Sequence, residues 1–366
     1  MKSGVLQAHA KPARRRYCKG ASVTEPVSPE ILFLKQEDVI KAGVLDMPKT
    51  IADVEKVFKM YAEGEIIQPV KTLLEFPDPE TGVRGRLVVS MPVFLGGDVQ
   101  RAGVKWAAES SANARRGDLP YGIDVVILHD LDRAHPVAIM DGTLITAMRT
   151  SAASGVAAKY LANPDSRVAG MVGAGVIGRT AIEAYLCVLP KLEEIRLYDL
   201  DRRKAEALAA EFSHRVRVRV TDSAREAVEG ADVLATQTTT RKHFLKREWL
   251  TASNFYAQMG TNEAEEDEIL QADVLVVDDW APIKHYTQGY FSQLVEQGRL
   301  QEERILELAP IVAGKIKART HPNQHILFKS MGMGSEDIIV AERIYQTAKA
   351  MGIGQKLKLW DQPLWL

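Results

Sequence analysis

The chain has 366 residues, of which 46% are hydrophobic and 26% are charged, values typical of a soluble globular protein with two domains. The formal net charge of −1 gives no reason to expect nucleic acid or a membrane as a partner, and no apolar run approaches the ~18 residues that would cross a bilayer. Only Cys18 and Cys187 are present, so we expect no structural disulfide and a reducing, cytoplasmic setting.

The N-terminal segment is basic, with no acidic residue before Glu25. This composition fits either an organellar presequence or a disordered extension. Pro12 and the scattered apolar residues argue against the amphipathic helix that a presequence requires. We therefore expect residues 1–28 to form a disordered basic tail.

The next segment, up to residue 160, is predicted to contain mostly consecutive strands. A helix is expected over 48–61, where apolar side chains recur at helical spacing, and another over 142–161, which Asn163-Pro164 ends. Strands that follow one another without helices indicate an antiparallel or mixed sheet in an α+β domain. The predicted strands cover 31–34, 70–76, 87–93, 102–107, 123–129 and 136–140, and a turn over 77–82 joins the second to the third.

An apolar run from Val168 ends in the pattern G-x-G-x-x-G at Gly173, Gly175 and Gly178, and a helical pattern follows directly. Glycine is needed there because the backbone must turn sharply and approach a pyrophosphate. The first helical turn, at Val176 and Ile177, directs free N–H groups toward the phosphates. The alternative is a glycine-rich turn in another α/β fold. A second strand favours the dinucleotide, because it ends in Asp199, about 20 residues after the last glycine, where a ribose hydroxyl is bound.

From residue 167 strands and helices alternate, which is typical of the parallel sheet of a doubly wound Rossmann domain. Its predicted strands cover 167–172, 194–198, 215–220, 232–235, 255–258 and 274–277, and the Arg/Val alternation of 215–220 predicts an edge strand. After about residue 310 the pattern stops, and the chain ends with a helix over 336–351. We expect a Rossmann domain of residues 161–310 inserted into a substrate domain made of residues 29–160 and 311–366.

The acid at position 199 favours NAD, since it repels a 2′-phosphate. Arg202 and Arg203 follow it and leave NADP as the alternative. We predict no metal site, because Pro322 interrupts the spacing of His321 and His325 and no cysteine–histidine pattern resembles a zinc site.

Three further segments give the chain a resemblance to the ornithine cyclodeaminase/μ-crystallin family from about residue 31 to residue 358. These segments are Gly103-Val104-Lys105-Trp106, Thr146-Ala147-Met148-Arg149-Thr150-Ser151-Ala152-Ala153 and Met331-Gly332-Met333-Gly334-Ser335-Glu336-Asp337. Residues 68–71, 90–92 and 276–280 are most similar to one branch, the N-((2S)-2-amino-2-carboxyethyl)-L-glutamate dehydrogenases of 2,3-diaminopropionate biosynthesis. The resemblance also implies a homodimer formed through the substrate domains.

The resemblance implies that Arg149 holds the substrate α-carboxylate, for which a guanidinium fork is well suited, and that Thr150 contacts the cofactor. It also implies that Lys105 contacts the substrate and transfers protons. The apolar neighbours of this lysine predict partial burial, which would lower its pKa toward neutrality and suit that role. Lys71 occupies the place of a carboxylate-binding arginine in the cyclodeaminases. The plainer alternatives are an ion-paired surface arginine and two strand lysines. Together the three cations suit a substrate with more than one carboxylate.

Asn262 is the most informative departure from the family. It falls where the cyclodeaminases carry a catalytic aspartate, and an amide cannot act as a general base. Cyclisation of ornithine needs such a base, so the exchange argues against this activity, unless Glu263, Glu265 or Glu266 compensates. A cluster of acids such as these three more often marks a loop exposed to solvent.

We therefore expect a NAD(P)-dependent oxidoreductase that acts on the C–N bond of an amino acid or N-carboxyalkyl amino acid, by hydride transfer and imine hydrolysis or by the reverse reductive amination. Ornithine cyclodeaminase, alanine dehydrogenase and ketimine reductase activities are the alternatives within enzymes. A crystallin-like protein that binds a nucleotide without turnover is the alternative outside them.

Overall fold

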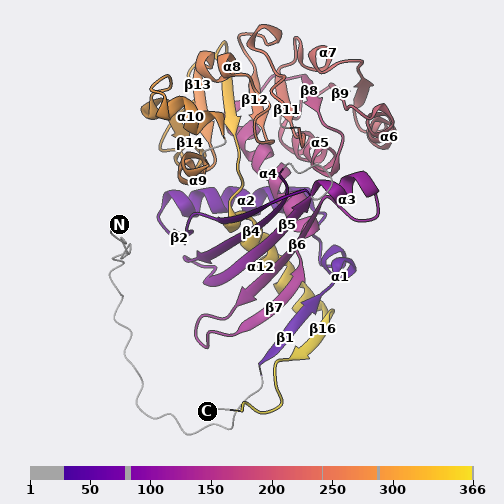
Figure 1. Ribbon diagram of the computed structural model, residues 1–366, viewed down its shortest axis with the longest axis vertical. Helices are drawn as coiled ribbons and strands as arrows, with labels where there is room; N and C mark the ends of the chain where they lie inside the picture. Colours follow the sequence, from indigo (N-terminus) through magenta and orange to yellow (C-terminus); the bar gives the residue numbers. More distant parts are fainter. Residues whose placement is uncertain (1–28, 79–83, 241, 287–288, 365–366) are drawn as a thin grey trace.

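The computed structural model describes residues 29–78, 84–240, 242–286 and 289–364, so the expected basic tail and most of the turn over 77–82 lie outside the described residues. Two β-sheets lie one above the other along the long axis of the molecule, and helices α2 (Met47–Ala62) and α4 (Thr143–Leu161) lie between them (Figure 1). Because α4 contacts strands of both sheets, it links the two halves of the chain.

The first sheet is mixed, as expected for the substrate domain. Its strands follow the order β16-β1-β7-β6-β5-β4-β2, with β3 also paired to β4, and only β1 and β7 run parallel. Helix α12 (Gly334–Met351) packs on one face, against β4, β5 and β6. The bounds are β1 Glu30–Leu34, β2 Ile66–Ile67, β3 Thr72–Pro77, β4 Arg84–Leu95, β5 Arg101–Ser110, β6 Gly122–His129, β7 Pro136–Asp141 and β16 Gln355–Lys358, with the short helices α1 Gln36–Lys41 and α3 Ser111–Arg116.

Side chains of this sheet alternate between the α12 face and the opposite face. Lys105, Asp124 and Val126 are buried on the α12 face, whereas Trp106 and Val125 are 49% and 38% exposed on the other. The strand period of two residues requires this alternation. It places the Lys105 side chain inside the molecule, on the face of the sheet that packs against α12.

The second sheet is entirely parallel, with the order β10-β9-β8-β11-β12-β15-β13-β14, and confirms the Rossmann fold. The strand order reverses between β8 and β11, where ligands of such sheets bind. Strand β10 lies at the edge, as its sequence predicts. The strands are β8 Val168–Val172, β9 Glu194–Tyr198, β10 Arg217–Val220, β11 Val233–Thr236, β12 Phe255–Gln258, β13 Val274–Val277, β14 Ile305–Glu307 and β15 Ile326–Lys329. The helices are α5 Val176–Val188, α6 Arg202–Phe212, α7 Ala224–Val228, α8 Glu266–Gln271, α9 Trp280–His285, α10 Tyr290–Glu296 and α11 Leu308–Val312.

Strand β15 corrects the expected domain boundary at residue 310. It lies between β12 and β13 in the second sheet, so the chain leaves this sheet only after Lys329. Its residues Ile326, Leu327 and Phe328 are fully buried, but such a short apolar run carries no periodicity that distinguishes a strand from a loop. The segment that follows β15 crosses directly to α12 of the first sheet.

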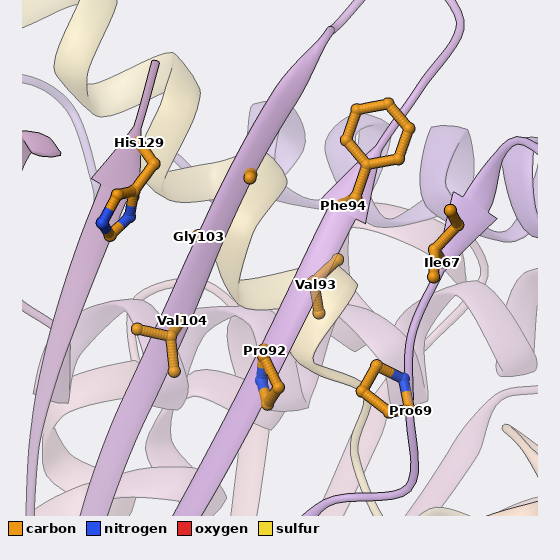
Figure 2. A pocket seen from close by; sticks show the side chains of 9 residues that line it. Ile67, Pro69, Pro92, Val93, Phe94, Gly103, Val104 and His129 are labelled. Carbon is orange, nitrogen blue, oxygen red and sulfur yellow. The ribbon is translucent and has the colours of Figure 1, made fainter. Parts of the chain in front are cut away.

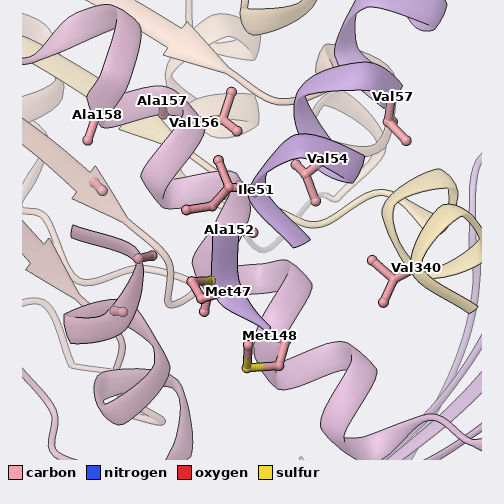
Figure 3. Close-up of a cluster of buried hydrophobic side chains, with 14 of the residues drawn as sticks. Met47, Ile51, Val54, Val57, Met148, Ala152, Val156, Ala157, Ala158 and Val340 are labelled. Carbon is pink, nitrogen blue, oxygen red and sulfur yellow. The ribbon is translucent and has the colours of Figure 1, made fainter. Parts of the chain in front are cut away.

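A hydrophobic core continues from one sheet to the other through α2, α4 and α12. Ile51 and Val54 of α2 pack with Ala152 and Val156 of α4 and with Val340 of α12 (Figure 3). Burying each of the valine and isoleucine side chains contributes roughly 1.5–3 kcal/mol. The core therefore holds α4, which carries the predicted carboxylate-binding arginine, firmly between the sheets.

No helix in the described part of the chain is long and apolar enough to cross a membrane.

Candidate active site

The glycine loop after β8 has the shape of a phosphate cradle. Gly173 has φ +109°, and a Cβ on Gly178 would lie 2.1 Å from the Gly173 carbonyl oxygen, so both positions require glycine. A Cβ on Gly175 would meet nothing within 4 Å. The space beside Gly175, at the N-terminus of α5, therefore suits a pyrophosphate. Val176 is 64% exposed and Ile177 is half-buried in the first turn of this helix.

The Asp199 carboxylate is fixed at the end of β9. Its Oδ2 accepts a hydrogen bond from the Ala174 N–H at 2.7 Å, and its Oδ1 accepts one from the Asp201 N–H at 2.8 Å. Arg202 pairs with Glu206 and Asp222, and Arg203 pairs with Asp201. The carboxylate at the end of β9 suits a ribose hydroxyl, and the two arginines beside it lie in exposed ion pairs.

Thr150 lies on α4 next to the first turn of α5. The following residue, Ser151, donates a hydrogen bond to the Ile177 carbonyl oxygen at 3.2 Å. The α4 helix thus reaches the nucleotide end of the second domain, and the contact of Thr150 with a cofactor stays a prediction.

Lys105 and Arg149 share one carboxylate on α12. Lys105 Nζ lies 2.9 Å from Asp337 Oδ2, and Arg149 Nε donates to Asp337 Oδ1 at 3.0 Å. Arg149 Nη1 also donates to Glu336 Oε2 at 2.9 Å. All four side chains are buried. The positive charges of Lys105 in β5 and Arg149 in α4 are therefore held by the two acids at the start of α12.

Burial shifts the pKa values of Lys105 and Glu336 in favour of their neutral forms. It lowers the pKa of Lys105, with the positive charge of Arg149 acting in the same direction. It raises the pKa of Glu336 to about 7, although Arg149 opposes the shift. For Arg149, burial opposes the charged form, but the ion pairs with Asp337 and Glu336 raise its pKa. Arg149 therefore stays charged, whereas the lowered pKa of Lys105 makes this group easier to deprotonate.

Lys71 approaches the same place from the segment between β2 and β3. Its Nζ donates to the carbonyl oxygens of Met331 and of Gly332, the latter at 3.3 Å. A Cβ on Gly332 would lie 2.5 Å from Arg149 Nη1, so this glycine separates the two cations. Burial lowers the pKa of Lys71 to about 8, and its positive neighbours Arg149, Lys105 and Lys329 add to the shift. The structure thus brings Lys71, Lys105 and Arg149 together.

Acids of the protein neutralise much of the positive charge of Lys105 and Arg149 through the ion pairs with Glu336 and Asp337. Asp278 accepts hydrogen bonds at Oδ2 from Ser330 Oγ at 2.8 Å and from the N–H groups of Met331 at 2.7 Å and Gly332 at 2.6 Å. The site is therefore a balanced network. A substrate carboxylate can bind only to the hydrogen-bond donors of these cations that make no bond within the protein.

Asn262 lies in the loop after β12, where its Oδ1 accepts a hydrogen bond from the Tyr290 N–H at 3.3 Å. The next residue, Glu263, is fully buried and binds the Thr238 N–H at 2.6 Å and the Gly260 N–H at 2.9 Å. Glu266 pairs with Arg299 at the surface. Glu263 therefore fixes two loops at the carboxyl edge of the parallel sheet, and neither of these two acids takes the place of the missing aspartate.

Sequence reasoning gave no role to several residues of the site: Asp124, Asp278, Lys329, Glu336 and Asp337. Lys329, at the end of β15, donates to the Gly260 carbonyl oxygen, and burial lowers its pKa to about 8. The paired acids Glu336-Asp337 stand in a segment that carries the family resemblance, which is the one signal that pointed to them.

Comparison with known proteins agrees with the family resemblance of the sequence. The family model described as the ornithine cyclodeaminase/mu-crystallin family matches residues 30–352. N-((2S)-2-amino-2-carboxyethyl)-L-glutamate dehydrogenase of Staphylococcus aureus is 29% identical over 335 residues, which cover 90% of this chain and 99% of that enzyme.

Two solved structures share the whole fold. The Δ1-pyrroline-2-carboxylate reductase of Thermococcus litoralis, in complex with NADH and L-proline, has a TM-score of 0.82 and 32% identity, with 89% of this chain and 100% of that chain covered. An archaeal alanine dehydrogenase dimer with bound NAD has a TM-score of 0.80 and 30% identity, with 90% and 100% covered.

Proposed function

Because the chain belongs to the ornithine cyclodeaminase/μ-crystallin family, we propose that it is a NAD-dependent oxidoreductase that acts on the C–N bond of an N-substituted amino acid. The convergence of Lys71, Lys105 and Arg149 between the two sheets carries this proposal. The named activities of the relatives, which are dehydrogenases and a reductase of amino or imino acids, support it.

Arg149 and Lys71 hold the substrate carboxylates. Asp337 and Glu336 fix the Nε and Nη1 groups of Arg149, and within the described residues no protein acceptor binds Nη2. This leaves Nη2 to donate to a carboxylate, while the Nζ of Lys71 provides a second positive contact beyond Gly332. Holding the substrate at two points fixes its Cα and removes several kcal/mol of the barrier.

NAD, held by the glycine loop and by Asp199, would supply the hydride acceptor for this reaction. The substrate loses the Cα hydrogen with its electron pair, and Lys105 takes a proton from the amine nitrogen as the C=N bond forms. Water then adds to the imine carbon, and the C–N bond breaks to give a 2-oxo acid and an amine. Burial supports this use of Lys105, since it lowers the pKa of this group toward neutrality.

The residues near Asn262 favour this reaction over cyclisation. An amide accepts no proton, and the carboxylate of Glu263 is already bound to the Thr238 and Gly260 N–H groups. Oxidation of an unsubstituted amino acid is the second candidate, because the archaeal alanine dehydrogenase covers 90% of this chain at 30% identity.

A substrate panel tests the proposed function. The protein is incubated with NAD or NADP and with amino acids and N-carboxyalkyl amino acids, NADH formation is followed, and the 2-oxo acid is identified. We expect turnover of an N-carboxyalkyl amino acid with NAD. Exclusive turnover of alanine would support the second candidate, and proline formation from ornithine would contradict the proposal. NAD binding without turnover of any compound would indicate a nucleotide-binding protein without catalysis.

The charge of Lys71 predicts how substrate affinity depends on pH. Its pKa of about 8 means that the ammonium form is lost as the pH rises from 7 to 9. We expect KM to rise roughly tenfold over this range, since the charged fraction falls by about that factor. The Lys71→Arg variant keeps its charge and is expected to remove most of the rise. Parallel KM profiles for the variant and the parent would show that Lys71 does not bind the substrate.

The face of the first sheet opposite α12 supports a homodimer. Five side chains that share this face are between 38% and 49% exposed: Leu74, Phe76, Trp106, Ile123 and Val125. The face continues into a shallow depression at Pro92 and Val104 (Figure 2). We propose that a second copy of this chain covers it, because large exposed apolar patches mark interfaces and the alanine dehydrogenase neighbour is a dimer.

Sedimentation velocity tests this interface. The parent is expected to sediment at the mass of two chains, and Trp106→Glu is expected to shift it to one chain, because a charge would be buried at the contact. A parent that sediments as a single chain at micromolar concentration would rule out the dimer.

A further inference from the structure

A chain of hydrogen bonds leads from Lys105 to Asp124 on the inner face of the first sheet. Lys105 Nζ donates to Thr146 Oγ1 at 3.3 Å, and Thr146 Oγ1 donates to Asp124 Oδ2 in a short hydrogen bond. Lys105 is paired with Val126 in the sheet register, so Asp124 lies two residues along the neighbouring strand on the same face. Thr146, in the first turn of α4, spans the gap between them.

The order of donors and acceptors along this chain suits proton movement. The Thr146 hydroxyl accepts from the lysine and gives its own hydrogen to a carboxylate. A second acid, Asp337, is farther from the hydroxyl, at 3.4 Å, and already contacts both Lys105 and Arg149. The chain therefore leads to Asp124.

The exposed fraction of the two acids also favours Asp124 as the end of the chain. Asp337 has no exposed surface, whereas Asp124 keeps 5%, three residues into β6. Lys105 itself is only 2% exposed, even without a ligand. Substrate and nicotinamide would cover it further, so its Nζ needs a route to water through the protein.

We propose that Thr146 and Asp124 form a proton-exchange path between Lys105 and solvent. The proposal rests on the proposed function, in which Lys105 takes the proton of the substrate amine. A proton moves from Lys105 to the Thr146 oxygen while the Thr146 hydroxyl hydrogen moves to Asp124, which leaves a neutral amine and a neutral carboxyl group. Asp124 then releases the proton to water. Thr146 and Asp124 act through Lys105 and are positioning residues.

The electrostatics of the pair lower the cost of this transfer. Burial lowers the pKa of Lys105 and raises the pKa of Asp124, so the two groups approach each other in proton affinity. The charged groups that face both are Asp337 of α12 and Arg149 of α4.

The exchange of the Lys105 ammonium hydrogens with water, followed by NMR of the ¹⁵N-labelled lysine, tests the path without substrate. The Lys105→Arg variant assigns the signal. We expect exchange to slow about tenfold or more in Asp124→Asn and Thr146→Val, and kcat to fall with it, since a positioned proton-transfer group contributes at least that factor. Thr146→Ser keeps a hydroxyl and is expected to exchange as the parent does.

Asp141→Asn is the matched control, because Asp141 ends the neighbouring strand β7 and accepts a bond from the Leu144 N–H of α4 at 3.4 Å but lies outside the chain to Lys105. Unchanged exchange in Asp124→Asn, or equal slowing in the serine and valine variants of Thr146, would overturn the path. If Asp124→Asn fails to fold, the serine and valine pair decides alone.

The two proposals fail separately. A parent protein that oxidises no amine overturns the proposed function, whereas the exchange rates still decide whether the path exists. A parent that turns over substrate while its Lys105 hydrogens exchange independently of Asp124 and Thr146 overturns the path alone.

Discussion

Replacement of Lys105 with methionine is expected to lower kcat by about 10²- to 10⁴-fold, the range that a positioned acid or base contributes. The aliphatic chain of methionine fills much of the same space between β5 and α12, and Asp337 keeps its ion pair with Arg149. NAD binding is expected to change by less than about twofold, because the glycine loop and Asp199 lie in the other sheet. Stopped-flow measurement of NADH formation and fluorescence titration of NADH check the two expectations.

The Lys105→Arg variant separates charge from proton transfer. Arginine keeps the ion pair with Asp337, but its pKa is too high for it to accept a proton near neutrality. We expect the arginine variant to lose about as much kcat as the methionine variant does. The Lys105→Ala variant is expected to regain part of its kcat when methylamine is added, because this free amine can take the place of the lysine side chain. Full activity of the arginine variant would limit position 105 to charge stabilisation.

The strands β5 and β6 were predicted from their β-branched and apolar residues, and the period of a strand then puts every second side chain on one face. The glycine spacing and Asp199 likewise predicted the nucleotide end of the second sheet, because these features are local in the chain. The apolar neighbours of Lys105 predicted a partly buried side chain, but an edge-strand lysine stayed the alternative until the fold showed that Lys105 lies on the inner face.

The acidic partners that neutralise the cations could not be predicted from the sequence. Arg149 meets Glu336 and Asp337 across 187 and 188 residues of sequence, and one sequence carries no signal for such a distant pairing. For the same reason Glu263 read as one of a group of loop acids, whereas the structure buries it beneath Thr238 and Gly260. Long-range charge pairing, not local pattern, decides which donors remain for a substrate.

Arg149→Ala is expected to lose both stability and substrate use. Removal of the guanidinium leaves Glu336 without its cation and Asp337 with Lys105 alone, and a buried pair broken on one side costs about 3–5 kcal/mol. Loss of the carboxylate contact is expected to lower kcat/KM by about 30- to 5,000-fold, which corresponds to the 2–5 kcal/mol that truncation of one partner of a buried charge pair costs. Thermal unfolding measures the loss of stability, and initial rates taken well below the unfolding midpoint of the variant measure the loss of substrate use.

The double variant Arg149→Met with Glu336→Gln separates these losses, because it removes both charges of one ion pair instead of one. Such a replacement of a buried pair by neutral groups is often close to neutral for folding, so we expect most of the lost stability to return. Substrate use is not expected to return, since no donor remains where Nη2 would hold the carboxylate, while NAD binding stays within about twofold of the parent. A double variant that regains turnover together with stability would mean that Arg149 only supports the fold, and the carboxylate would have to bind elsewhere.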